Sequence, residues 1–239
     1  MWTCRMNINV KRFENFLDVV QVCDSTFPIG TFNHSFGMEN YLRTDKITNA
    51  DDFEIWLDTY LKTQFKYGEG LLINLCFKAL EEEKIEVIWE YDKIITCSSQ
   101  AAETRNGTKM IAKQMIDLVQ TLHDIPLLDD YKQQIKKATV YGNPAIVFAI
   151  FAHYKGLDAD EAILLYGYSI NSTMIQNAVR AVPLGQKSGQ LILQRTIPLL
   201  EEIVAEMKQL DASYLGANVP GIELSQINHE TQVFRLFMS

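Results

Sequence analysis

Residues 143–156 read Asn143-Pro-Ala-Ile-Val-Phe-Ala-Ile-Phe-Ala-His-Tyr-Lys-Gly156 and contain one of the longest apolar runs of the chain. The Asn-Pro pair is typical of a helix start, because Asn caps free backbone N–H groups and Pro fits the first helical position. Gly156 suits the left-handed residue that follows a helix. The apolar runs within this stretch and in residues 162–170 predict two central helices that their neighbours bury on nearly all sides.

Apolar residues recur at helical spacing in most of the chain. One stripe with i, i+3, i+4, i+7 spacing consists of Phe13, Phe16, Leu17 and Val20. No stretch alternates with the period of two that a strand requires. The sequence therefore predicts an all-α fold, a single-domain helical bundle of about ten helices. These helices are expected near residues 12–23, 35–42, 51–67, 69–82, 85–104, 107–122, 128–139, 144–155, 159–181 and 187–209.

The helical pattern ends after Asp211 and divides the chain into two parts. Residues 1–210 are expected to form the all-helical domain. Residues 211–239 are too polar for a core and too aromatic for a segment that only meets solvent. We therefore expect them to form a C-terminal tail that binds a partner.

Composition and charge narrow the class of protein. The 239 residues are 47% hydrophobic, which excludes a disordered chain. The 22 basic and 30 acidic residues give a net charge of −8, which argues against a nucleic-acid partner. The four cysteines are widely spaced, which favours reduced thiols, and they are Cys4, Cys23, Cys76 and Cys97. No secretion signal is evident, and no apolar run reaches the ~18–20 residues of a membrane span, so we expect a cytoplasmic protein that binds no membrane.

Searches for catalytic and nucleotide-binding motifs are negative. Residues 167–171 resemble a nucleophile elbow, but they lack its final glycine and lie in a helical stretch. Residues 185–188 resemble the end of a phosphate loop, yet Gln186 stands where the second glycine is required. The four histidines contain no i, i+4 pair that would suit zinc.

A first conspicuous segment, residues 24–39, reads DSTFPIGTFNHSFGME. Its proline and glycine predict a turn between two helices, with Asn33 or Ser35 capping the second helix. The alternative is a functional role for the polar pair His34-Ser35, which lies among three phenylalanines. His34 could bind a metal only with further ligands, which the sequence does not locate.

A second segment, residues 171–190, reads NSTMIQNAVRAVPLGQKSGQ. It places amides and hydroxyls on an otherwise apolar helix, which predicts either a hydrogen-bonded network or a partner surface. Arg180 precedes the proline that ends this helix. It either satisfies carbonyls at the helix end or belongs to that surface.

A third segment, residues 227–237, reads INHETQVFRLF. Its aromatic and aliphatic side chains around Arg235 have the composition of an interface anchor. The alternative is a tail that folds back on its own domain. A further arginine, Arg105, is expected between two helices.

In this order and spacing, the segments resemble the urease accessory protein F family. The family patterns are DSxLPIGxFxHSxGxE, AVRxVPLGQxxGQ and xHETQxxRLFxS, which correspond here to residues 24–39, 178–190 and 229–239. Phe27 replaces the usual leucine, and Asn33 replaces a commoner serine. The resemblance extends over essentially the whole chain, although residues 80–140 carry little of the pattern.

The resemblance implies a non-enzymatic, dimeric, cytosolic all-α protein that helps insert nickel into apo-urease. Its expected partners are a second copy of the chain, the accessory protein called D or H, the GTPase G, and apo-urease. No cofactor is expected to bind stably, because the complex handles nickel and the partner GTPase binds GTP. No nucleic acid is expected among the partners.

The resemblance also implies which residues bind partners. Residues expected to bind the D/H protein are His229, Glu230, Arg235, Leu236 and Phe237. Residues expected on the same or a neighbouring face are Phe32, His34 and Ser35. Candidates for the surface that receives the GTPase are Arg105, Arg180 and Gln186. No catalytic, cofactor-binding or metal-binding residue is predicted.

Two other functions stay open from the residues alone. One is a stand-alone nickel-binding metallochaperone that uses His34, Cys23 or other scattered donors, although a stable nickel site needs several converging ligands. The other is an all-α hydrolase that uses Ser169 or the acidic runs at residues 81–83 and 201–202. Both acidic runs lie on charged helical faces.

Overall fold

The computed structural model describes residues 2–217 and 219–238, with side chains from Arg12 onward, so the Cys4 side chain and Ser239 lie outside the described residues. Within these ranges the chain is helical and contains no strand, which confirms the all-α prediction. The helices are α1 (Trp2–Cys23), α2 (Met38–Arg43), α3 (Ala50–Tyr60), α4 (Leu71–Glu81), α5 (Ile85–Ser98), α6 (Ala102–Leu122), α7 (Pro126–Lys136), α8 (Pro144–Tyr154), α9 (Ala159–Ala181), α10 (Gln186–Met207) and α11 (Pro220–His229). Two short 3-10 helices, η1 (Thr31–Asn33) and η3 (Ala212–Tyr214), and a π-helix, η2 (Leu61–Gly70), complete the fold.

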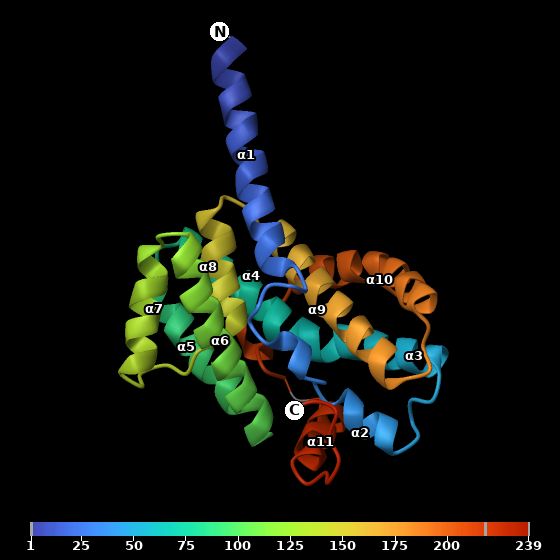
Figure 1. The fold of residues 1–239 in the computed structure, drawn as a ribbon. Helices are drawn as coiled ribbons and strands as arrows, with labels where there is room; N and C mark the ends of the chain where they lie inside the picture. Colours follow the sequence, from blue (N-terminus) through green and yellow to red (C-terminus); the bar gives the residue numbers. More distant parts are fainter. Residues whose placement is uncertain (1, 218, 239) are drawn as a thin grey trace.

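Helix α8 lies at the centre of the bundle and packs against α4, α6, α7 and α9 (Figure 1). Every residue from Pro144 to Ala152 is buried, and Asn143 caps the helix by accepting a hydrogen bond from the Ala145 N–H at 2.9 Å. The predicted central helix is thus confirmed. The second apolar run, residues 162–170, is buried less fully than expected, because α9 turns Tyr168 toward solvent.

A buried carboxylate orders the turn that leads into α8. Asp92 accepts hydrogen bonds from the backbone N–H groups of Tyr141 at 2.6 Å and Gly142 at 2.9 Å, and also from the Tyr131 hydroxyl. The Tyr131 hydroxyl in turn accepts from the Asn143 N–H at 2.8 Å. Since Asp92 is fully buried, these donors replace the water that its charge would otherwise require.

The π-helix η2 joins α3 to α4 and contains a kink at Gly68, whose backbone has φ −100° and ψ −112°. The sequence predicts a helix break at this point, between residues 67 and 69. The adjacent Gly70 is tightly packed, because a Cβ atom there would lie 2.9 Å from Met207 Sδ. The kink brings Glu69 to the wall of an internal cavity.

Helix α1 extends away from the bundle (Figure 1). Its attached part is held by Lys155, whose Nζ lies 2.5 Å from the Asp18 carboxylate and whose carbonyl accepts from the Asn15 amide at 3.0 Å. Phe13 and Leu17 of the predicted apolar stripe are 68% and 63% exposed. The stripe is therefore an uncovered surface of the isolated chain.

Three expectations about local structure are wrong. Arg105 lies in the first turn of α6 rather than between helices, because the break falls at residues 99–101. The N-terminal cap of α2 is Gly37, rather than Asn33 or Ser35. Helix α11 was not expected, since its apolar pattern is weak and tertiary packing stabilises it.

We expect Asp92→Ala to lower the free energy of unfolding by about 2–4 kcal/mol, because it leaves buried donors of the 141–143 turn unpaired. Chemical denaturation followed by circular dichroism measures this change. The matched control is Asp130→Ala, which removes an exposed carboxylate from α7 and should cost less than about 0.5 kcal/mol. Equal stability of the two variants would contradict the role assigned to Asp92.

Candidate partner-binding face

The three conspicuous sequence segments meet on one face of the molecule. Helix α11 packs against α2 and α6, and the chain ends beside them (Figure 1). The Met238 N–H donates to the Asn33 carbonyl at 2.7 Å, and the Asn177 amide donates to the His34 carbonyl at 3.0 Å. We call this surface the motif face. The residues that define it are Phe32, His34, Glu39, Glu103, Asn177, Arg180, His229, Glu230, Arg235 and Phe237.

Glu39 is the buried centre of the motif face, with a side chain only 1% exposed. Its carboxylate lies 3.0 Å from His229 Nε2 and accepts backbone N–H groups from Leu236 at 2.7 Å and Phe237 at 3.1 Å. Arg43 of the same helix adds a weaker contact at 3.4 Å. A single carboxylate from α2 thus fixes the conformation of the end of the chain.

His229 is fully buried between two carboxylates. Its Nδ1 atom lies 3.0 Å from Glu103, opposite the contact between Nε2 and Glu39. The donor and acceptor roles of the two ring nitrogens depend on which of them carries a proton. Burial alone would raise the pKa of Glu103, but hydrogen bonds from His229 and Arg235 outweigh it and lower that pKa below its ordinary value.

Arg235 and Glu230 attach the tail to α6. Arg235 pairs with Glu103 at 2.5 Å and donates to the Glu230 carbonyl at 2.7 Å. The Glu230 carboxylate accepts from the N–H groups of Ala102 at 2.6 Å and Glu103 at 3.2 Å. It therefore caps α6, whose own N-cap residue Ala101 supplies no acceptor.

Arg180 joins the second segment to the other two. Its guanidinium carbon lies 5.1 Å from the centre of the Phe32 ring and 6.0 Å from that of Phe237. This is cation–π geometry, and the expected alternative, satisfaction of carbonyls at the end of α9, is not among the contacts of the described residues. The polar residues earlier in α9 form internal bonds, as the pair of Asn171 and Thr196 shows.

His34 is buried in the same region, and its ring packs against Gly107, where a Cβ atom would lie only 2.6 Å from Cε1. Burial lowers the pKa of His34, and repulsion from His229 lowers it further. The neighbouring Ser35 is buried, and its hydroxyl has no hydrogen-bond partner among the described atoms. Within the described residues, no group of three or more His, Cys, Asp or Glu side chains is placed to hold a metal ion.

The tail folds back on the domain, yet it leaves an apolar surface uncovered. Phe237 is buried, whereas Val233, Phe234, Leu236 and Met238 are 89%, 75%, 64% and 57% exposed. Both expectations for this segment therefore describe part of it. Its polar groups bond to the domain, and its exposed side chains have the apolar character of an interface anchor.

Two predicted site residues lie apart from this network. Arg105 donates to the carbonyls of Ser99 and Gln100, each at 2.7 Å, and thereby satisfies the end of α5. Gln186 begins α10 and is exposed, and none of the hydrogen bonds among the described residues joins it to the motif face.

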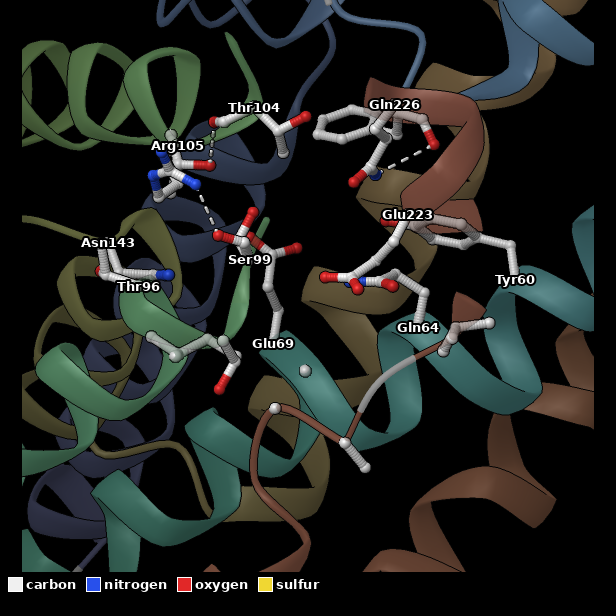
Figure 2. A pocket seen from close by; sticks show the side chains of 18 residues that line it. Tyr60, Gln64, Glu69, Thr96, Ser99, Thr104, Arg105, Asn143, Glu223 and Gln226 are labelled. Carbon is white, nitrogen blue, oxygen red and sulfur yellow. Dashed lines mark hydrogen bonds between the residues drawn. The ribbon is translucent and has the colours of Figure 1, made fainter. Parts of the chain in front are cut away.

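A cavity lined partly by polar side chains lies between η2, α5, α6 and α11. Side chains from η2, α5, α6 and α11 point toward it, among them Gln64, Glu69, Arg105, Glu223 and Gln226 (Figure 2). A second, more apolar cavity adjoins it, because Phe36, Glu69 and Thr108 line both. Burial raises the pKa of Glu69 to about 7, although a hydrogen bond from Tyr166 opposes that shift.

Sequence reasoning missed Glu39, Glu103 and Glu69 as site residues. Glu39 is the last residue of the first segment, so the pattern itself contains a signal for it. Glu103 and Glu69 carry no local signal, since their importance depends on residues brought to them from distant parts of the chain.

The fold and the motif face define a class of protein. It is an all-helical protein whose conspicuous sequence segments contact one another on one face. The family model for UreF matches residues 47–197. The chain is 60% identical over 237 residues to the urease accessory protein UreF of Streptococcus salivarius (strain 57.I), a match that covers 98% of this chain and 100% of that protein.

More distant relatives match over nearly the same length. Identity is 40% over 223 residues to the urease accessory protein UreF of Bacillus sp. (strain TB-90), with 93% of this chain and 98% of that protein covered. It is also 40% over 227 residues to the one from Ureaplasma urealyticum serovar 10, with coverage of 94% and 97%. The chain belongs to the UreF family of urease accessory proteins, as its sequence patterns predict.

We expect Glu39→Gln to loosen the end of the chain, because the variant removes the charge that faces His229 and places an amide near backbone N–H donors. Leaving these buried donors without an acceptor costs about 1–3 kcal/mol, which corresponds to roughly 10- to 100-fold faster exchange of the amide protons of residues 236 and 237. Hydrogen exchange measures this rate. The control is Glu201→Gln on an exposed part of α10, and unchanged exchange in Glu39→Gln would contradict the central role of this carboxylate.

The pKa of Glu69 predicts a pH dependence of stability. The folded chain binds this proton more tightly than the unfolded chain, since burial raises the pKa from 4.5 to about 7. The free energy of unfolding should therefore fall as pH rises from about 4.5 to about 7, and Glu69→Gln should lack this contribution. Denaturant unfolding across this range compares the variant with the wild type and with the exposed control Glu81→Gln. A parallel pH dependence in all three proteins would contradict the prediction.

Proposed function

We propose that this chain is a non-enzymatic accessory protein of urease maturation, which assists the GTP-dependent insertion of nickel into apo-urease. It acts as a scaffold that binds the D/H accessory protein and, together with it, recruits the GTPase G. Membership of the UreF family supports this proposal. Nickel is the cargo of the assembly, GTP binds to the partner GTPase, and the chain itself holds no cofactor stably.

The observation that carries the proposal is the network of charged residues on the motif face. Charged residues from three distant segments bond to one another at Glu39 and Glu103, which fixes the tail in one conformation. The same tail leaves Phe234 and Leu236 exposed. Exposed apolar side chains beside an arginine are typical of a protein-binding surface, and here a rigid scaffold presents them.

The predicted partner-binding residues take two kinds of role in this proposal. Exposed residues bind partners directly, with Leu236 and the neighbouring Phe234 at the D/H protein and Arg180 and Gln186 on the side of the GTPase. Buried or bonded residues shape that surface, and these are Phe32, His34, Ser35, Arg105, His229, Glu230, Arg235 and Phe237. This division follows from their exposure and hydrogen bonds.

The scaffold is proposed to be a cytoplasmic homodimer. The exposed apolar stripe of α1 supports self-association, because Phe13 and Leu17 would be covered by a second copy. No helix among the described residues is long and apolar enough to cross a bilayer.

Co-purification tests the scaffold and the tail together. The tagged chain, co-expressed with its cognate D/H protein and GTPase, should recover both as a two-fold assembly. The variant Phe234→Asp with Leu236→Asp should lose at least about ten-fold in D/H recovery while remaining folded, because both side chains are exposed. The matched control is Ile55→Asp, an exposed apolar residue of α3 that should leave recovery unchanged.

Each outcome of this experiment has one meaning. If the wild type recovers neither partner, the scaffold proposal is wrong. If the tail variant still recovers the D/H protein, the assignment of the tail is wrong although the scaffold proposal stands. Calorimetry of the isolated chain with nickel adds a separate test, since tight stoichiometric binding would favour the stand-alone metallochaperone.

A further inference from the structure

Arg180 differs from the other described arginines in what its guanidinium contacts. The side chains of these other arginines all donate hydrogen bonds to carboxylate or carbonyl oxygens, and they are Arg12, Arg43, Arg105, Arg195 and Arg235. Arg180 has no hydrogen bond or ion pair among the described residues, and its contacts are with two aromatic rings. Its five N–H donors therefore have no hydrogen-bond acceptor among the described residues.

The two rings hold this guanidinium in a defined place. Phe32 comes from η1 and Phe237 from the buried part of the tail, so both rings belong to segments that are themselves fixed. Cation–π contact with two rings restricts a long, flexible side chain and thereby reduces the entropy that a ligand would otherwise have to remove. Arg180 nevertheless remains exposed at the end of α9. The result is a preorganised cation with free donors at the surface.

We propose that Arg180 is the docking point for an aspartate or glutamate side chain of a protein partner. The planar fork of a guanidinium matches a carboxylate with two parallel hydrogen bonds. This inference rests on the proposed function, which places Arg180 on the side of the GTPase, so the carboxylate belongs to that partner. It deepens that function by naming the chemical group that the motif face receives.

Charge favours a carboxylate over a phosphate as the occupant. A polyanion such as a nucleotide or nucleic acid requires several cations, whereas the chain has a net charge of −8 and one unpaired guanidinium at this point. One carboxylate matches one guanidinium.

Binding measurements on the full chain with purified D/H protein and GTPase test this proposal. The variant Arg180→Gln should weaken binding of the GTPase by about ten-fold or more at low salt and leave binding of the D/H protein unchanged, since a hydrogen-bonded charge pair contributes at least that factor. Arg180→Lys should recover only part of the wild-type affinity, because an ammonium group lacks the planar fork. Lys187→Gln, at an exposed residue of α10, is the control for loss of one positive charge and should bind as the wild type does.

Salt dependence separates carboxylate docking from a merely structural role. If Arg180 receives a carboxylate, the affinities of wild type and Arg180→Gln should converge as ionic strength rises. A ratio of the two affinities that stays constant with salt would mean that Arg180 only holds the tail. Equal affinities at low salt would mean that Arg180 neither holds the tail nor receives a carboxylate. Either result overturns the proposal. If the wild type binds no partner, the proposed function and this inference fail together.

Discussion

A buried carboxylate on α2 is the interaction on which the candidate site depends. Glu39 lies inside the protein and would be costly there without donors, since a buried charge needs compensation of several kcal/mol. Its donors are the ring of His229 and two backbone N–H groups of the tail. The carboxylate of Glu39 therefore selects one conformation for the end of the chain, and the cation–π contact of Phe237 with Arg180 follows from that conformation.

Most of the helical framework could be predicted because its signals are local. Asn143 caps α8 and Asp158 forms the capping box of α9 within their own helices, so a few neighbouring residues suffice to predict both starts. The boundary between α5 and α6 could not be predicted in this way. The cap of α6 is Glu230, which is distant in sequence, and Gly107 lies inside the helix at a point where a Cβ atom would collide with His34. Neither constraint exists until the chain is folded.

The candidate site also has a part that local sequence predicts and a part that depends on the folded chain. The three segments identify residues that differ from ordinary helix packing, and the fold brings most of them to one face. Their sequence does not show that His229 is fully buried or that Arg105 bonds to the end of α5. Those properties depend on Glu103 and on the carbonyl of Ser99, which the patterns do not mark. A pattern can thus identify a set of residues, whereas the division of roles among them requires coordinates.

The buried and the exposed residues of the motif face have different roles in binding a partner. The groups that define its shape, Glu39 and His229, are buried and bonded to each other, so a partner cannot compete for their hydrogen bonds. The groups that a partner can reach are the guanidinium of Arg180 and the exposed apolar side chains beside Phe237. Recognition by such a face combines one directional charge with a non-directional apolar surface. Because the tail carries the apolar part and α9 carries the charge, both are presented together only while the contacts of Glu39 with His229 and with the tail backbone hold the tail in place.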